Sequence, residues 1–160
     1  MQLQIISPHS YCVVATPSAT GYVNGTGNFS DMRYIRVATG SWNSCCKIFI
    51  QFEGGHMADR IEITVLNSNT DYIQCYGLFA SNSGFVKAIF LCNKNLAWNS
   101  EWDLFIGLVV PYDTTIYVKE IINYNGSHSL VVDNERTTEP PNIAKSITLT
   151  NSVGFFYSSN

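Results

Sequence analysis

The chain has 160 residues, of which 46% are hydrophobic and only 13% charged, and its formal net charge is −3. This length suits one domain that buries about 70% of its unfolded surface, so a disulfide framework is not needed for stability. Lysine and arginine occur singly rather than in a basic patch, which argues against nucleic-acid binding. The sequence has no signal peptide and no run of about 18 apolar residues, so we expect no membrane insertion.

Apolar residues alternate with period two along most of the chain, and glycine, asparagine, serine and proline interrupt the pattern about every ten residues. The predicted strands are 2–6, 10–15, 32–39, 45–52, 60–67, 71–79, 85–92, 102–110, 114–122, 129–133, 146–150 and 153–157. The polar stretch 133–142, which holds two of the five prolines, is predicted to be a loop. Many short strands without a helical segment predict an all-β fold, which could be a sandwich, a jelly roll or a barrel.

Two adjacent cysteines, Cys45 and Cys46, begin the predicted strand 45–52. Successive side chains of a strand point to opposite faces, so the two thiols point apart. The residues expected to share a face with Cys46 are Ile48, Ile50 and Phe52. The remaining cysteines are the isolated Cys12, Cys75 and Cys92. Zinc sites need closely spaced ligands, so we expect no metal, no cofactor and five free thiols in a reducing cytosol, with at least one of the adjacent pair packed in a β layer.

Two predicted strands, 85–92 and 102–110, are apolar on both faces, whereas the apolar residues of 60–67 alternate cleanly with polar ones. In an antiparallel fold, a strand of the first kind either lies between layers or has its second face covered by another subunit. Both explanations stay open. The second would place an oligomer interface on these strands.

We find no catalytic constellation in the sequence. The histidines His9, His56 and His128 lie far apart, and neither an HExxH motif nor a GxSxG motif is present. Glu101 and Asp103 stand on one face of one strand, whereas glycoside hydrolysis needs two carboxylates facing each other across a cleft. We therefore expect both acids to be surface residues, with Asp103 available for a ligand hydrogen bond, and the protein not to be an enzyme.

The three tryptophans have different surroundings in the sequence. Trp102 shares a strand face with apolar residues and is predicted to be in the core. Trp42 and Trp98 lie in polar loops beside asparagines, and a ring flanked by amides matches both the apolar face and the hydroxyl rim of a sugar. Alternatively, each of these two covers an end of the sandwich as a lid. The candidate residues of a shallow groove for a neutral or weakly charged glycan are Trp42, Asn43, Asn95, Trp98, Asn99 and Tyr124.

Four short segments follow one another in a distinctive order over 32–132. They are YIRV at 34–37, a strand closing in the glycine pair 54–55, IYVK at 116–119 and YNG at 124–126. This order resembles the C-terminal β-domain of bacteriophage tail fibre and tailspike proteins, over about two thirds of the chain. The family pattern contains no catalytic residue to carry over.

The resemblance implies one domain, 1–160, that forms the C-terminal part of a longer fibre or spike, with N-terminal strands and a connecting loop at 1–31 and the sandwich core at 32–160. It implies an all-β fold in which each protomer is an antiparallel β-sandwich that is jelly-roll-like, and a homotrimer that binds bacterial surface polysaccharide or lipopolysaccharide. The protein would belong to the virion and assemble in the host cytoplasm. Two alternatives stay open: a structural cap that stabilises the trimer without a ligand, and a capsid-type viral jelly roll.

Overall fold

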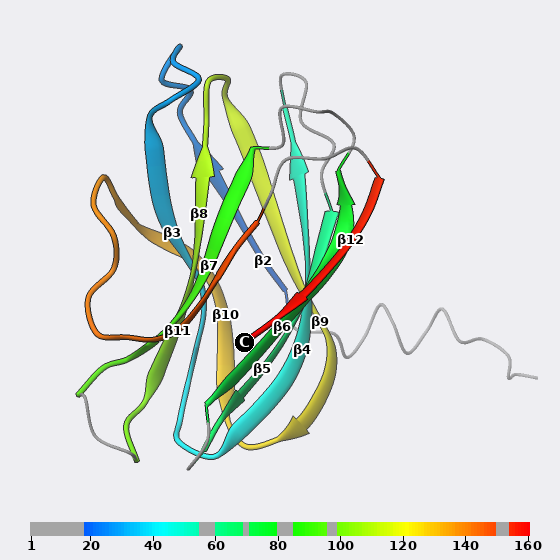
Figure 1. The fold of residues 1–160 in the computed structure, drawn as a ribbon, viewed down its shortest axis with the longest axis vertical. Coiled ribbons are helices and arrows are strands. Elements are labelled where there is room, and N and C mark those ends of the chain that lie inside the picture. Colours follow the sequence, from blue (N-terminus) through cyan, green and yellow to red (C-terminus); the bar gives the residue numbers. More distant parts are fainter. Residues whose placement is uncertain (1–17, 55–59, 69–70, 80–84, 96–98, 150–153) are drawn as a thin grey trace, which may run out of the picture.

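The computed structural model describes residues 18–54, 60–68, 71–79, 85–95, 99–149 and 154–160, which form two antiparallel sheets packed face to face (Figure 1). The five-stranded sheet has the order β10-β3-β8-β7-β11 and the six-stranded sheet the order β12-β6-β5-β4-β9-β2. The predicted fold class, an antiparallel β-sandwich, is confirmed. The described residues contain no helix that is long and apolar enough to cross a membrane.

The strands of the five-stranded sheet are β3 (Met32–Gly40), β7 (Val86–Asn93), β8 (Trp102–Val109), β10 (His128–Arg136) and β11 (Ile143–Thr148). Those of the six-stranded sheet are β2 (Ser18–Val23), β4 (Ser44–Glu53), β5 (Arg60–Asn67), β6 (Tyr72–Phe79), β9 (Thr114–Asn125) and β12 (Gly154–Ser159). In the second sheet the consecutive strands β4, β5 and β6 lie side by side, and β9 returns beside β4 after β7 and β8. This order is a Greek key.

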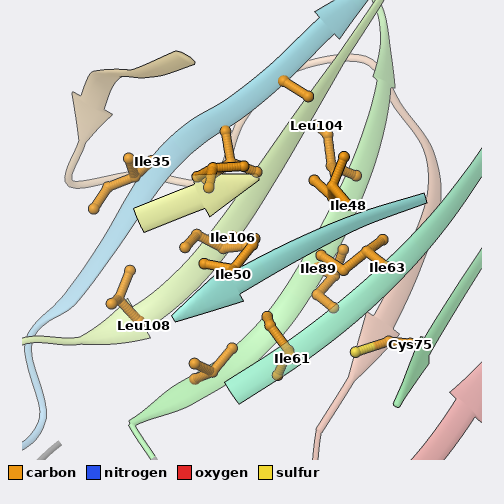
Figure 2. Packing of buried hydrophobic residues seen from close by; sticks show 14 of the residues in the cluster. Ile35, Ile48, Ile50, Ile61, Ile63, Cys75, Ile89, Leu104, Ile106 and Leu108 are labelled. Atoms are coloured by element: carbon orange, nitrogen blue, oxygen red, sulfur yellow. The ribbon is translucent and has the colours of Figure 1, made fainter. Parts of the chain in front are cut away.

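The core lies between the sheets and is built by the predicted alternation. In β4, the face that begins with Cys46 is buried and the face that begins with Cys45 is half-buried, as expected. The neighbouring β5 alternates in the same way, with its isoleucines and valine buried. Figure 2 shows side chains from both sheets meeting in this layer, among them Ile48, Ile63, Ile89 and Leu104.

Trp102 belongs to this core, as predicted, and is fully buried. Its indole N–H lies 2.6 Å from Ser44 Oγ and 3.1 Å from the carbonyl oxygen of Ser41. Across the ladder, Trp102 pairs with Gly40 of β3. The largest core side chain is thus held by both packing and hydrogen bonds at the point where β3 passes into β4.

Several elements differ from the predicted ones, and β11, for example, begins at Ile143 and not at the predicted residue 146. Strand β2 was not predicted because its sequence, SATGYV, has only weak alternation, and it forms by pairing with β9 at the sheet edge. Strand β9 continues to Asn125, three residues beyond the predicted end. The predicted loop 133–142 is wrong for its first four residues, since β10 runs to Arg136. Charged cross-strand pairs hold that polar strand end, namely Arg36 with Asp133 and Arg33 with Glu135.

The second apolar face of β7 and β8 is buried within one chain. Phe90, Cys92 and Phe105 form a second cluster with Tyr34 on the outer face of the five-stranded sheet, and Phe105 is only 2% exposed. The segment 137–142 loops out on this side of the sheet (Figure 1), and Pro140 within it is buried. The apolar pattern of 85–92 and 102–110 therefore needs no partner subunit to explain it.

Candidate functional site

Most of the predicted ligand residues lie at one end of the sandwich, which we call the turn end and define by the segments 41–43, 94–95, 99–101 and 124–127. These segments meet because Gly40, at the end of β3, pairs with both Trp102 and His128, the first residues of β8 and β10. The predicted residues found there are Trp42, Asn43, Asn95, Asn99 and Tyr124. Trp98 lies outside the described residues.

Hydrogen bonds lock connection 41–43 to connection 126–127. The backbone N–H and the hydroxyl of Ser41 both donate to the carbonyl oxygen of Ser127, at 2.9 and 3.1 Å. The side-chain amide of Asn125 donates to the carbonyl oxygen of Asn43 at 2.8 Å. Asn43 adopts a left-handed conformation with φ 61°, which asparagine tolerates better than most residues. These contacts hold the two turns as one rigid surface.

Two aromatic rings project from this surface. Trp42 is 37% exposed and Tyr124 is 53% exposed. Tyr124 stands at a β-bulge, because Cys45 and Cys46 of β4 pair with Asn125 and Asn123 and leave the tyrosine as the extra residue. Bulges commonly re-aim a side chain. Trp102 fills the core beneath this end, where its N–H donates to the carbonyl oxygen of Ser41.

Asn95 and Asn99 lie in the neighbouring hairpin between β7 and β8, and both are exposed. The backbone N–H of Asn95 donates to Ser100 Oγ at 2.9 Å, and Lys94 closes the hairpin with a 2.9 Å bond to the carbonyl oxygen of Glu101. The structure therefore places Trp42 and Asn43 on a turn that is hydrogen-bonded to Asn125, the neighbour of Tyr124 in β9, and it places Asn95 and Asn99 in the adjacent hairpin.

A pocket that the sequence did not reveal lies beside this hairpin, on the outer face of the five-stranded sheet. Its volume is about 160 Å³. Residues that line it include Lys94, Asp103, Phe105, Asn134, Arg136 and Asn142. They come from β7, β8, β10 and the following segment, so no local sequence pattern joins them. The one sequence feature that pointed to this pocket is Asp103, which is the acid expected to be available for a ligand hydrogen bond.

Asp103 is not the surface residue that we expected, because its side chain is only 15% exposed. Its carboxylate accepts from Arg36 at 3.1 Å and lies 3.7 Å from Lys94 Nζ. Arg36 also donates to both carboxylate oxygens of Asp133, at 2.9 Å each, and these bonds raise the pKa of its guanidinium. Glu101, with a side chain 64% exposed, is a surface residue as predicted.

Burial sets the chemistry of the described cysteines. Desolvation raises the pKa of Cys46, Cys75 and Cys92 to about 12 each. For Cys92 the nearby Asp103 adds to this shift, whereas the positive charge of Arg136 opposes it. These thiols stay protonated near neutral pH, so they are poor nucleophiles. The described residues contain no cluster of three or more histidine, cysteine or acidic residues suited to a metal ion.

One histidine has an unexpected partner. His128, interpreted from the sequence as an ordinary loop residue, begins β10 and pairs through Nε2 with Glu120 of β9. A histidine beside a carboxylate is the arrangement of a general base, but here the histidine side chain is only 2% exposed and its Nδ1 atom is buried without a described hydrogen-bond partner. The pair links the two sheets at the β9–β10 corner. His9 and His56 lie outside the described residues.

No protein-family model, curated protein or solved structure matches this chain. The turn end and the pocket therefore have to be interpreted from their own chemistry. Exposed aromatic rings beside amides on rigid turns, and a small polar pocket close by, are the features of a binding module for a polar ligand.

Proposed function

We propose that the chain is a non-enzymatic attachment module of the tail-fibre type, which acts as a homotrimer in a bacteriophage virion and binds a bacterial surface polysaccharide or lipopolysaccharide at the turn end. The observation that carries this proposal is the exposure of Trp42, on the turn 41–43, and of Tyr124, at the bulge of β9, where hydrogen bonds join that turn to the end of β9 and the residues after it. Large exposed rings on a rigid surface offer contact area at a low entropy cost.

A sugar ring suits this surface because it has an apolar face and a rim of hydroxyl groups. The aromatic rings supply the apolar contact, and the exposed amides of Asn43, Asn95 and Asn99 supply donors and acceptors without net charge. The low charged fraction of the chain, 13%, agrees with a neutral polar ligand. Affinity per site would be modest, and three linked sites would raise it about 100-fold through effective concentration.

The test is binding of the protein to an array of bacterial surface polysaccharides and lipopolysaccharides, with the melting temperature measured on the same samples. Trp42→Ala and Tyr124→Ala should each lose binding and keep the melting temperature, because both side chains are exposed. Trp98→Ala is the companion variant for the predicted residue outside the described part of the chain.

The matched control is Phe29→Ala, which removes an exposed aromatic ring, 60% exposed, near β2 and β3 at the opposite end of the sandwich. This variant should bind as the unmodified protein does. Equal loss of binding in Phe29→Ala and Trp42→Ala, or no binding of the unmodified protein to any glycan on the array, would reject the glycan-binding proposal.

A second candidate function is a structural cap that stabilises a trimer and binds nothing. It is favoured by the exposed isoleucines of β9, Ile121 and Ile122, which are 44% and 41% exposed next to Tyr124. Adjacent exposed apolar side chains are typical of surfaces that another subunit covers. In this alternative the protein forms the oligomer but binds no glycan on the array.

A further inference from the structure

The pocket beside the β7–β8 hairpin contains a positive charge, that of Arg136, for which the described residues supply no carboxylate partner. Arg136, at the end of β10, makes one described hydrogen bond, a long one of 3.5 Å from Nε to the carbonyl oxygen of Thr138. The other pocket cation, Lys94, lies near both Glu101 and Asp103. Among the described residues, no carboxylate lies within ion-pair distance of Arg136. Its planar guanidinium suits a carboxylate ligand, which it can bind through two parallel hydrogen bonds.

The pocket is shaped before any ligand binds. Asn142, which begins the return of the chain to β11, donates from its side-chain amide to the carbonyl oxygen of Lys94 at 3.2 Å and accepts at its own carbonyl from the Asn93 N–H at 3.0 Å. Asn134 and Asn142 both have left-handed backbones, with φ 51° and 58°. Such conformations persist where the surroundings determine them strongly. Hydrogen bonds therefore fix this wall of the pocket to the β7–β8 hairpin.

Size and chemistry select the ligand class. The volume of about 160 Å³ is that of about five liquid waters and is below the range of drug-sized ligands, so it suits a single sugar ring. Phe105 supplies an apolar part of the lining, and Asn134 and Asn142 line the same pocket. Asp103 accepts hydrogen bonds from hydroxyl groups but repels a multiply charged anion such as phosphate, so it favours a monoanion with hydroxyls.

We propose that this pocket binds a carboxylate-bearing sugar residue of the uronic acid class, with the carboxylate on Arg136 and the ring hydroxyls on Asp103 and the asparagine amides. This inference rests on the proposed glycan-binding function and adds to it an acidic sugar in the polysaccharide, bound next to the turn end. One polysaccharide would then contact Trp42 and Tyr124 with a neutral stretch and place an acidic sugar residue in the pocket.

The experiment is an NMR titration of the ¹⁵N-labelled protein with four separate probes: glucuronate, glucose, acetate and inorganic phosphate. Glucuronate should shift the backbone resonances of Cys92, Asn93 and Asn142 and bind at least about tenfold more tightly than each of the other probes. Arg136→Gln should weaken glucuronate at least about tenfold, since it removes the charged fork.

The matched control is Arg33→Gln, which removes an equal charge from the neighbouring β3, where Arg33 pairs with the exposed Glu135 and does not line the pocket. It should change glucuronate affinity by less than about twofold, as expected for a surface charge. Far-UV circular dichroism checks that both variants are folded, and Arg136→Lys replaces Arg136→Gln if the latter is not.

Three results would overturn the inference: no shift of pocket resonances with glucuronate, equal binding of acetate or phosphate, or unchanged glucuronate affinity in the Arg136 variants. The polysaccharide array separates this failure from failure of the proposed function. If glucuronate leaves the pocket unchanged while Trp42→Ala still abolishes array binding, only the acidic-sugar inference is lost.

Discussion

The contact between Gly40 and Trp102 leads to a quantitative prediction. An alanine Cβ at position 40 would lie 2.4 Å from two ring carbons of Trp102, Cε2 and Cζ2, and 2.7 Å from Nε1. Ordinary contact begins at 3.4 Å, so the closest overlap is 3.4 − 2.4 = 1.0 Å. The fully buried indole cannot move away easily because its N–H is bonded to Ser44 and Ser41. Gly40→Ala should therefore lower the free energy of unfolding by about 1–3 kcal/mol, the usual cost of overpacking.

A double-mutant cycle isolates this contact. Trp102→Leu removes all three ring atoms that the new methyl group would meet, and by itself should cost about 2–4 kcal/mol as a large-to-small core substitution. In that background Gly40→Ala should cost less, which gives a coupling energy of about 1–2 kcal/mol. The assay is urea unfolding followed by far-UV circular dichroism, because tryptophan fluorescence changes with the substitution. An unchanged slope with denaturant shows that the variants share one unfolded state.

Gly107→Ala on β8 is the control substitution. Its Cβ would lie 3.2–3.3 Å from side-chain atoms of Met32, Tyr34 and Phe90, none of which belongs to the indole. The cost of Gly107→Ala should be the same with and without Trp102. The argument is refuted if Gly40→Ala is neutral in the unmodified protein, or if its cost is identical in the two backgrounds.

Three further predictions follow from burial and charge. Burial raises the pKa of Cys46, Cys75 and Cys92 to about 12, above the value of about 8.5 in the unfolded chain. The neutral thiols therefore contribute stability that is fully present below about pH 8.5 and is lost as the pH rises toward 12. The urea midpoint should fall between about pH 8 and about pH 10.5, and thiol titration should count all five cysteines in denaturant; a pH-independent midpoint or a stable disulfide would contradict this. Asp103→Asn should cost about 1 kcal/mol in urea unfolding, and the exposed control Glu101→Gln less than about 0.5, whereas the reverse order would be inconsistent with the geometry. Phe105→Lys should unfold the chain by burying a charge, whereas Ile122→Lys should leave it folded and dissociate the proposed trimer. Light scattering that finds a monomer in the unmodified protein would reject the proposed trimer.

The sequence by itself determined the parts of the fold that depend on near neighbours. Alternation with period two assigned the faces of β4 and β5, and it placed Trp102 in the core, because the geometry of a strand sends every second side chain to the same side. The sequence also identified the polar turn that carries Trp42 and Asn43, whereas Tyr124, expected in a turn, lies in β9. These inferences needed no knowledge of which strands pair.

Only the tertiary structure decided what depends on distant pairs. Strand β2 has weak alternation and forms by pairing with the edge of β9. The second apolar face of β8 is buried within one chain, since Phe105 is only 2% exposed. Lys94 and Arg136, which are far apart in the sequence, line one pocket. The pair of Glu120 and His128 links the two sheets. Such contacts depend on strand order and register, which period-two alternation does not encode, since any strand with one apolar face can pair in several ways.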